Sequence, residues 1–236
     1  MQRLKNKIAL ITGASRGIGA AVAKRFAAEG AQVILTARTV GGLEAVDDAI
    51  RAAGGHPAVL VPLDLRGGDM IDALGAQVYE RFGKLDILVG NAAMLGTLSP
   101  VSHAAPAEVE DVFAVNTIAN YRLIRVFDPL LRLAGEGRVV MVTSGAAAAP
   151  IAYWGPYAAS KAALEHLTLT YAAEVKSTGL RVNLLDPGAV ATRMRASAFP
   201  GEDPASLPAP EAITEWFVRL AEAGAPHAQR VVVREG

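Results

Sequence analysis

The sequence of 236 residues contains no cysteine. Disulfide bonds, cysteine nucleophiles and cysteine-ligated metal sites are therefore excluded. A net charge of either sign is also lacking, since 23 Lys and Arg residues balance 23 Asp and Glu residues. A neutral chain has no overall field to attract nucleic acid or an anionic membrane. We expect neither of them as a partner.

Long hydrophobic runs are absent as well. The first apolar run begins at Ile8 and is too short for the core of a signal peptide, and no run of about 18 apolar residues follows. The sequence therefore predicts a cytoplasmic protein. No metal site is expected, because the histidines lack the spacing of metal ligands; they are His56, His103, His166 and His227.

Short apolar runs rich in β-branched residues recur along the chain, and most lack alternation with polar residues, as parallel strands buried on both faces do. They lie at 8–11, 33–35, 59–63, 87–89, 139–142, 182–185 and 231–233. Segments with helical periodicity separate them, and Gly30, Gly54 and Gly83 follow expected helix ends as left-handed caps. The pattern predicts an α/β fold: one doubly wound Rossmann domain over residues 1–236, with a seven-stranded parallel sheet and helices on both faces. A proline-rich stretch predicts a lid or substrate segment over about 189–210.

Glycines and polar residues gather where the expected strands end. They are Thr12, Gly13, Ala37, Arg38, Asp64, Gly90, Asn91, Ala92, Ser144, Asp186, Pro187 and Gly188. The carboxyl ends of parallel strands share one edge of a sheet, where helix N-termini and loop amides also collect. We therefore expect one ligand site along this edge.

A glycine-rich turn, Thr-Gly-Ala-Ser-Arg-Gly-Ile-Gly over residues 12–19, follows the first strand. Gly13, Gly17 and Gly19 remove side chains where the backbone turns tightly and would approach a diphosphate at a helix N-terminus. The spacing differs from both G-x-G-x-x-G and the P-loop, and turn chemistry alone is the alternative explanation.

The end of the second strand bears on cofactor choice. Ala37 and Arg38 stand where an NAD site needs a carboxylate for the ribose 2′-hydroxyl. Arg38 and Arg16 would together clamp a 2′-phosphate, because guanidinium groups bind phosphate in a bidentate manner. The sequence thus predicts that NADP(H) is preferred over NAD(H), although both arginines could instead be solvated surface residues.

Ser144, Tyr157 and Lys161 form the expected catalytic set. Tyr157 and Lys161 lie four residues apart on an expected helix after Pro156, so they share one face. The phenol pKa is ordinarily near 10, and an adjacent ammonium group favours the phenolate and lowers that pKa. Ser144 would donate a hydrogen bond to a substrate carbonyl, and Tyr157 would supply the proton.

These motifs resemble those of the short-chain dehydrogenase/reductase family, a group of Rossmann-fold NAD(P)-dependent oxidoreductases, over about 7–233. The matching positions are the glycine motif at 12–19, Asp64, Leu65, Asn116, Ser144, Tyr157, Lys161, Pro187, Gly188 and Thr192. In this chain the family's Asn-Asn-Ala-Gly motif reads Gly-Asn-Ala-Ala at 90–93. A positive φ at Ala93 would be strained.

The resemblance implies catalytic roles for Asn116, Ser144, Tyr157 and Lys161. Tyr157 would act as acid in reduction and base in oxidation, Lys161 would also hold the nicotinamide ribose, Asn116 would support a water relay, and Thr192 would contact the carboxamide. The implied cofactor site comprises Gly13, Ser15, Arg16, Gly17, Ile18, Gly19, Arg38, Asp64, Leu65, Asn91, Ala92, Ala93, Tyr157, Lys161, Pro187, Gly188, Val190 and Thr192.

We therefore predict an NADP(H)-dependent oxidoreductase that interconverts a ketone or aldehyde and an alcohol. The alternatives are a 3-oxoacyl-thioester reductase and a non-catalytic NADP-binding sensor or scaffold. Expected pocket walls favour a medium-sized apolar substrate, while Arg193 and Arg195 would suit an anionic tail or be solvated. The walls are Met94, Leu95, Ala146, Tyr153, Trp154, Ala189 and 194–199. The helix after Asn116 and the helix that bears Tyr157 carry excess apolar surface, and relatives pair such helices, so we expect a homodimer or homotetramer.

Overall fold

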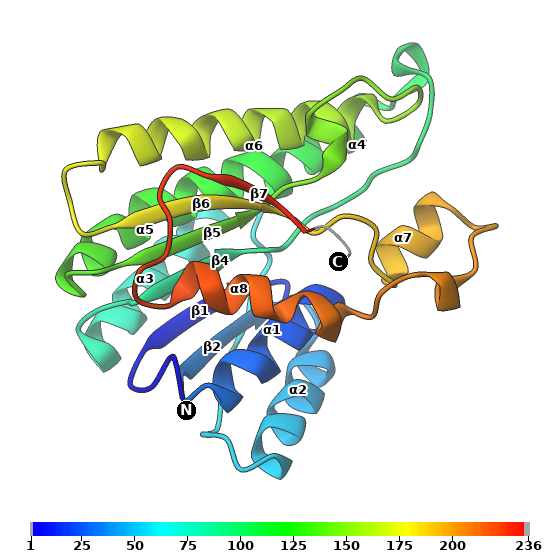
Figure 1. Ribbon diagram of the computed structural model, residues 1–236. Helices are drawn as coiled ribbons and strands as arrows, with labels where there is room; N and C mark the ends of the chain where they lie inside the picture. Colours follow the sequence, from blue (N-terminus) through cyan, green and yellow to red (C-terminus); the bar gives the residue numbers. More distant parts are fainter. Residues whose placement is uncertain (1, 234–236) are drawn as a thin grey trace.

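The computed structural model describes residues 2–233, which form a twisted sheet between two layers of helices (Figure 1). Seven strands pair in the order β3-β2-β1-β4-β5-β6-β7, and every pairing is parallel. The strands are β1 Ile8–Thr12, β2 Gln32–Ala37, β3 Val59–Pro62, β4 Ile87–Gly90, β5 Arg138–Val142, β6 Arg181–Asp186 and β7 Arg230–Val232. The predicted seven-stranded parallel Rossmann sheet is confirmed.

Helices cover both faces of the sheet (Figure 1). One face carries α1 Gly17–Ala28, α2 Val40–Ala52 and α8 Thr214–Ala221, and the other carries α3 Gly68–Phe82, α5 Ala119–Leu133 and α6 Gly155–Glu174. α4 Pro106–Phe113 runs into α5 through a π turn, η2 Ala114–Ile118. Beyond the strand ends lies α7 Arg193–Ala198, and the short 3-10 turns are η1 Val101–His103, η3 Gly145–Ala147, η4 Pro204–Ser206 and η5 Pro210–Ile213.

Two apolar cores result from the alternation of side chains along the buried strands. Ile11 and Leu35 face the layer that contains Phe26 and Phe217. Leu10 and its neighbours face the opposite layer, under α3, α5 and α6. No helix within residues 2–233 is long and apolar enough to cross a membrane.

Glycines end the helices as expected. Gly30, Gly54 and Gly83 have φ angles of +88°, +79° and +71°. In this left-handed region a side chain would be strained, so glycine can stop a helix and turn the chain toward the next strand. The predicted caps are confirmed.

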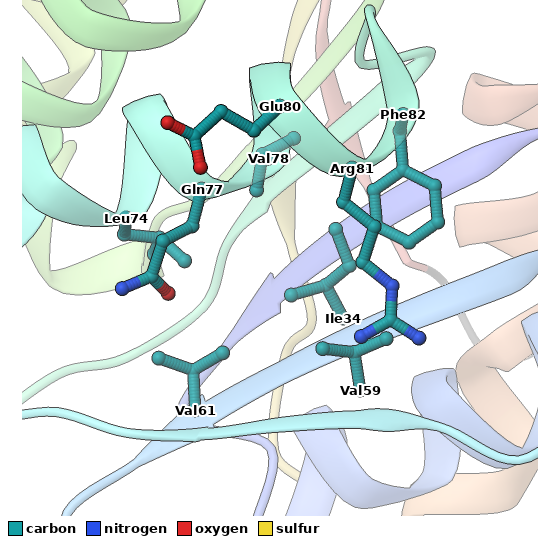
Figure 2. A pocket seen from close by; sticks show the side chains of 9 residues that line it. All are labelled: Ile34, Val59, Val61, Leu74, Gln77, Val78, Glu80, Arg81 and Phe82. Carbon is teal, nitrogen blue, oxygen red and sulfur yellow. The ribbon is translucent and has the colours of Figure 1, made fainter.

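The topology fixes where a ligand can bind. Chain order reverses between β1 and β4, which are adjacent in the sheet, so the connections leave their carboxyl ends in opposite directions and open a crevice there. A separate cavity of about 320 Å³ lies between α3 and the edge strand β3 (Figure 2). Its lining includes Val59, Val61 and Phe82 and none of the predicted site residues.

Candidate active site

The glycine-rich turn packs tightly against the end of β4. Gly13 has a φ of +66°, and a Cβ atom there would lie 2.9 Å from the Cα atom of Ala92. The Thr12 hydroxyl accepts hydrogen bonds from the backbone N–H groups of Asn91 and Ala92, both at 3.0 Å, and the Asn91 side chain donates to the Thr12 carbonyl at 2.8 Å. A Cβ atom at Gly19 would overlap the Gly13 carbonyl and the Asn91 amide. Only glycine fits at these positions.

The loop after β6 packs against the glycine-rich turn. A Cβ atom at Gly17, whose φ is +56°, would lie 3.5 Å from the Thr192 methyl group. Gly17 opens α1, and Arg16 at its N-cap makes no side-chain cap, so backbone N–H groups of the first turn face the crevice uncapped. A helix N-terminus of this kind attracts anionic groups. These features fit the diphosphate of a dinucleotide.

At the ends of β2 and β3 the structure places arginines and one carboxylate. Arg16 and Arg38 are exposed, and within residues 2–233 neither forms an ion pair. The Asp64 carboxylate pairs with Arg66 at 2.7 Å, and Arg66 also pairs with Asp111 at 3.0 Å. Hydrogen bonds from Arg66 hold the pKa of Asp64 below its ordinary value, with a further contribution from the charge of Arg38. Leu65 is buried in the core beside them.

Ser144, Tyr157 and Lys161 converge at the end of β5. The Ser144 hydroxyl accepts a hydrogen bond from the Ala146 N–H at 3.2 Å, so its own proton can be donated to another acceptor. Lys161 is 1% exposed, and its ammonium donates to the Val142 carbonyl at 2.8 Å. The same ammonium lies 6.0 Å from the centroid of the Tyr157 ring.

Burial governs the protonation of this set. It raises the pKa of the Tyr157 phenol, hydrogen bonding from Ser144 opposes the rise, and the charge of Asp186 adds to it. Burial also lowers the pKa of Lys161 to about 8, against the opposing charge of Glu165. That Lys161 lowers the phenol pKa stays a prediction: its ammonium is directed at the Val142 carbonyl, and burial is the largest influence on the phenol.

Asn116 lies in the π turn η2 and ties two parts of the site together. Its amide exchanges hydrogen bonds with the backbone of Met94 at 2.7 and 2.8 Å and donates to the Ser160 hydroxyl at 2.9 Å. Ser160 in turn donates to the Tyr157 carbonyl at 2.7 Å. Asn116 therefore fixes α6, the helix that carries Tyr157 and Lys161, through Ser160, a residue that sequence reasoning missed. The only feature of the sequence that could have indicated Ser160 was its position next to Lys161.

The departures from the family's Asn-Asn-Ala-Gly motif have a structural explanation. Ala93 is not among the non-glycine residues with positive φ within residues 2–233, so the strain considered above does not arise. A Cβ atom at Gly90 would overlap the Met141 sulfur and the Asn120 side-chain oxygen. The volume that the family's Asn side chain requires is thus filled from β5 and α5.

Aromatic side chains border Tyr157. The Trp154 ring lies edge-on to the Tyr157 ring, with centroids 5.8 Å apart, and 5.7 Å from the Phe199 ring. Phe199 follows α7 and carries the Arg195 guanidinium 3.8 Å above its ring. Both side-chain oxygens of Glu202 accept from Arg195 at 2.6 Å, so Arg195 is already engaged, while Arg193 is exposed.

Comparisons with known proteins agree with this geometry. The model of the short chain dehydrogenase family matches residues 7–203. The oxidoreductase YciK of Escherichia coli K12 is 36% identical over 219 residues, which cover 92% of this chain and 86% of YciK. Ketoacyl reductase HetN of Nostoc sp. PCC 7120 is 35% identical over 192 residues, which cover 80% of this chain and 66% of HetN.

A solved structure is also similar. The short chain dehydrogenase from Escherichia coli CFT073, complexed with NADPH, superposes with a TM-score of 0.95 at 34% sequence identity, and the match covers 100% of both chains. The family match, the relatives and the convergence of the glycine turn with Ser144, Tyr157 and Lys161 lead to one conclusion. The chain belongs to the short-chain dehydrogenase family and is an oxidoreductase.

Proposed function

We propose that this enzyme interconverts a carbonyl compound and an alcohol by hydride transfer, with NADP(H) as cofactor and Tyr157 as general acid and base. The observation that carries the proposal is the convergence of Ser144, Tyr157 and Lys161 beside the glycine turn, at the carboxyl edge of the sheet. The proton donor Tyr157 and the glycine turn, which would bind the diphosphate, thus lie in one crevice. Together they supply the two halves of a carbonyl reduction.

The cofactor supplies the hydride when it is bound. The glycine turn and the N-terminus of α1 would hold its diphosphate, Asn91 and Ala92 would support the crevice, and Thr192 lies close enough to Gly17 to close over it. Arg16 and Arg38 would hold a 2′-phosphate, because both are exposed next to this turn. The NADPH complex of the Escherichia coli CFT073 relative supports the same cofactor class.

The protein groups act on the carbonyl oxygen. The Ser144 hydroxyl donates to this oxygen and stabilises the negative charge that develops on it. Tyr157 then gives its proton to the same atom. Burial keeps the phenol protonated at neutral pH, which suits an acid in the direction of reduction. In oxidation the phenol must first lose its proton, so that direction needs higher pH.

The substrate walls are mostly apolar. Trp154 and Phe199 stand beside Tyr157, and the Arg195 charge is neutralised by Glu202. A medium-sized apolar ketone or aldehyde is the proposed substrate class. The name of the relative HetN favours a second candidate, a 3-oxoacyl thioester.

We propose in addition that the whole chain is one domain and that it works as a homodimer or homotetramer. Apolar side chains on η2, α5 and α6 remain exposed: Ile118 is 44%, Tyr121 49% and Leu169 36% exposed. A second copy would cover them. A molecular mass of one chain by light scattering at micromolar concentration would exclude this assembly.

The function is tested by cofactor fluorescence followed by turnover in the same samples. NADPH is expected to bind more tightly than NADH and to be oxidised by ketones, aldehydes or acetoacetyl thioesters, which distinguishes the substrate classes. Tyr157→Phe should abolish turnover and leave NADPH affinity unchanged, since only the proton donor is lost. Tyr79→Phe, at an exposed tyrosine on α3, is the matched control. Tight NADPH binding without turnover of any carbonyl would favour the sensor, and turnover by Tyr157→Phe would refute the assigned role.

A further inference from the structure

An ionic cluster joins α6, β6 and β7 next to the loop that carries Ser144. Arg230 comes from β7, a strand of only three residues. Its Nε donates to the Glu165 carboxylate of α6 at 2.8 Å, and one terminal nitrogen donates to the Asp186 carboxylate of β6 at 3.1 Å and to the Ser144 carbonyl at 3.2 Å. One guanidinium thus joins α6, β6 and the loop that carries the catalytic serine.

The register of the last two strands aims Arg230 at these groups. Arg230 pairs with Leu184, and Val232 pairs with Asp186. Residues 184 and 186 point to the same face of the sheet, the face covered by α6. The planar guanidinium has five N–H donors in a fixed fork, so it can satisfy three acceptors that a lysine could not reach together.

Glu165 connects the cluster to the catalytic helix. It lies one turn after Lys161 on α6, and its carboxylate also accepts from the buried Thr143 hydroxyl at 2.7 Å. The side chains of Arg230, Glu165 and Asp186 are 26%, 16% and 7% exposed. At such burial an unbalanced charge acts on its neighbours with little screening from water.

Within the described part of the chain, the charge of Asp186 acts on the Tyr157 phenol, the Lys161 ammonium lies 6.0 Å from the ring centroid, and Arg230 pairs with both Asp186 and Glu165. Lys161 and Glu165 lie on the same helix, Asp186 lies at the end of β6, and Arg230 lies on β7. On the lid, Arg195 is paired with Glu202 and faces Phe199 instead. Without Arg230, the charges of Asp186 and Glu165 would be left unpaired.

We propose that Arg230 is a positioning residue of the active site, which fixes the Ser144 backbone and balances the charges of Glu165 and Asp186 near Tyr157. The proposal rests on the function proposed above. It assigns a catalytic purpose to the short edge strand β7, which otherwise adds only three residues to the sheet.

The test compares four variants by two readouts. The first is kcat for carbonyl reduction with NADPH. The second is the ionisation of the Tyr157 phenol in the cofactor-free protein, followed by NMR of ¹³Cζ-labelled tyrosine as the pH rises from about 8 to about 12 and compared as the fraction ionised at each pH, with Tyr157→Phe to assign the signal. Because the second readout needs no turnover, failure of the proposed function leaves it interpretable.

Arg230→Met should lower kcat at least about fivefold, because the Ser144 carbonyl loses a charge-assisted hydrogen bond. It should also raise the titration of Tyr157 by about 0.5–1 pH unit, because two carboxylates remain unbalanced. Arg230→Lys restores the charge and should return the titration to within about 0.2 unit of the wild type, but it should not restore kcat, since the fork is lost. NADPH affinity should stay within about twofold throughout, because Arg230 does not touch the glycine turn.

Glu165→Gln keeps a side chain of the same shape and removes one negative charge, so the Tyr157 titration should move downward. If Arg230→Met does not fold, Glu165→Gln still tests the proposal through the direction of its titration shift. Arg219→Met is the matched control, because Arg219 is 58% exposed and pairs with Glu215 on α8, away from the site. Unchanged kcat and titration in Arg230→Met, or titration shifts of the same sign in Arg230→Met and Glu165→Gln, would overturn the proposal.

Discussion

A methyl group at position 90 has no space in this fold. Gly90 ends β4, and a Cβ atom built there overlaps the Met141 sulfur and the Asn120 side-chain oxygen. Met141 is 0% exposed and Asn120 2%, so neither side chain has free volume to enter. Overpacking a core by one such group costs typically about 1–3 kcal/mol. We expect Gly90→Ala to lose about 2 kcal/mol of unfolding free energy, a drop in Tm of roughly 4–8 °C for a chain of this size.

The cause can be isolated with a double-mutant cycle. Met141→Ala alone should cost about 2–5 kcal/mol, because it leaves a cavity. In the double variant the alanine at position 90 occupies part of that cavity, so the loss should be smaller than the sum of the single losses by at least about 1 kcal/mol. Urea denaturation of the four proteins measures the unfolding free energies directly.

Gly41→Ala is the matched control for this cycle. Gly41 lies in α2, and a Cβ atom there meets no atom within 4 Å. The same substitution in open space should stabilise the helix by about 0.5–1 kcal/mol, because alanine loses less backbone entropy than glycine. If Gly90→Ala were as stable as wild type, or if the cycle were additive, the overlap at β4 would not explain the glycine.

Three further predictions concern the cofactor, the pH profile and backbone strain. Arg38→Asp should weaken NADPH binding and shift the affinity ratio toward NADH by at least about tenfold, since a carboxylate repels a 2′-phosphate and suits a ribose hydroxyl; an unchanged ratio in a fluorescence titration would exclude the clamp. Because burial lowers the pKa of Lys161 to about 8 while it raises that of Tyr157, kcat/KM for reduction should fall with increasing pH near pH 8 as Lys161 loses its proton, and a profile that stays flat to pH 10.0 would contradict this assignment. Tyr153 has a φ of +73°, so Tyr153→Gly should raise the unfolding free energy by about 0.5–1 kcal/mol, as measured by urea denaturation.

The fold could be predicted because its signals are local. Seven apolar runs marked seven strands, with bounds within a residue or two of those observed. Gly30, Gly54 and Gly83 marked helix ends, since a left-handed residue is a property of the chain at that point. The short helix α7 was not predicted, because its six residues, just before the proline-rich stretch that begins at Pro200, show no clear period.

The site was predictable where spacing alone determines geometry. Tyr157 and Lys161 share a helix face because they are four residues apart, and the glycine turn follows a strand and opens a helix. Contacts between segments far apart in the sequence were harder to predict, because no local pattern marks them. Ser144 lies 86 residues before Arg230, yet the two are in contact, and an arginine beside the apolar run at 231–233 was the only hint. Glu165, one turn after Lys161, could have been found from the same spacing argument.

The protonation of Tyr157 and Lys161 depends on more than their spacing in the sequence. The four-residue interval places an ammonium near a phenol, and that pairing taken alone lowers the phenol pKa. In the folded chain burial is the largest influence on both groups: it raises the pKa of Tyr157 and lowers that of Lys161. Burial is a collective property: here it depends on β5, β6 and η3, which pack against α6. The same packing places Asp186, whose charge raises the pKa of Tyr157, at the end of β6, and brings Arg230 within hydrogen-bond distance of Asp186 and Glu165; these groups come from other strands and helical turns, so the Tyr157–Lys161 spacing does not predict them.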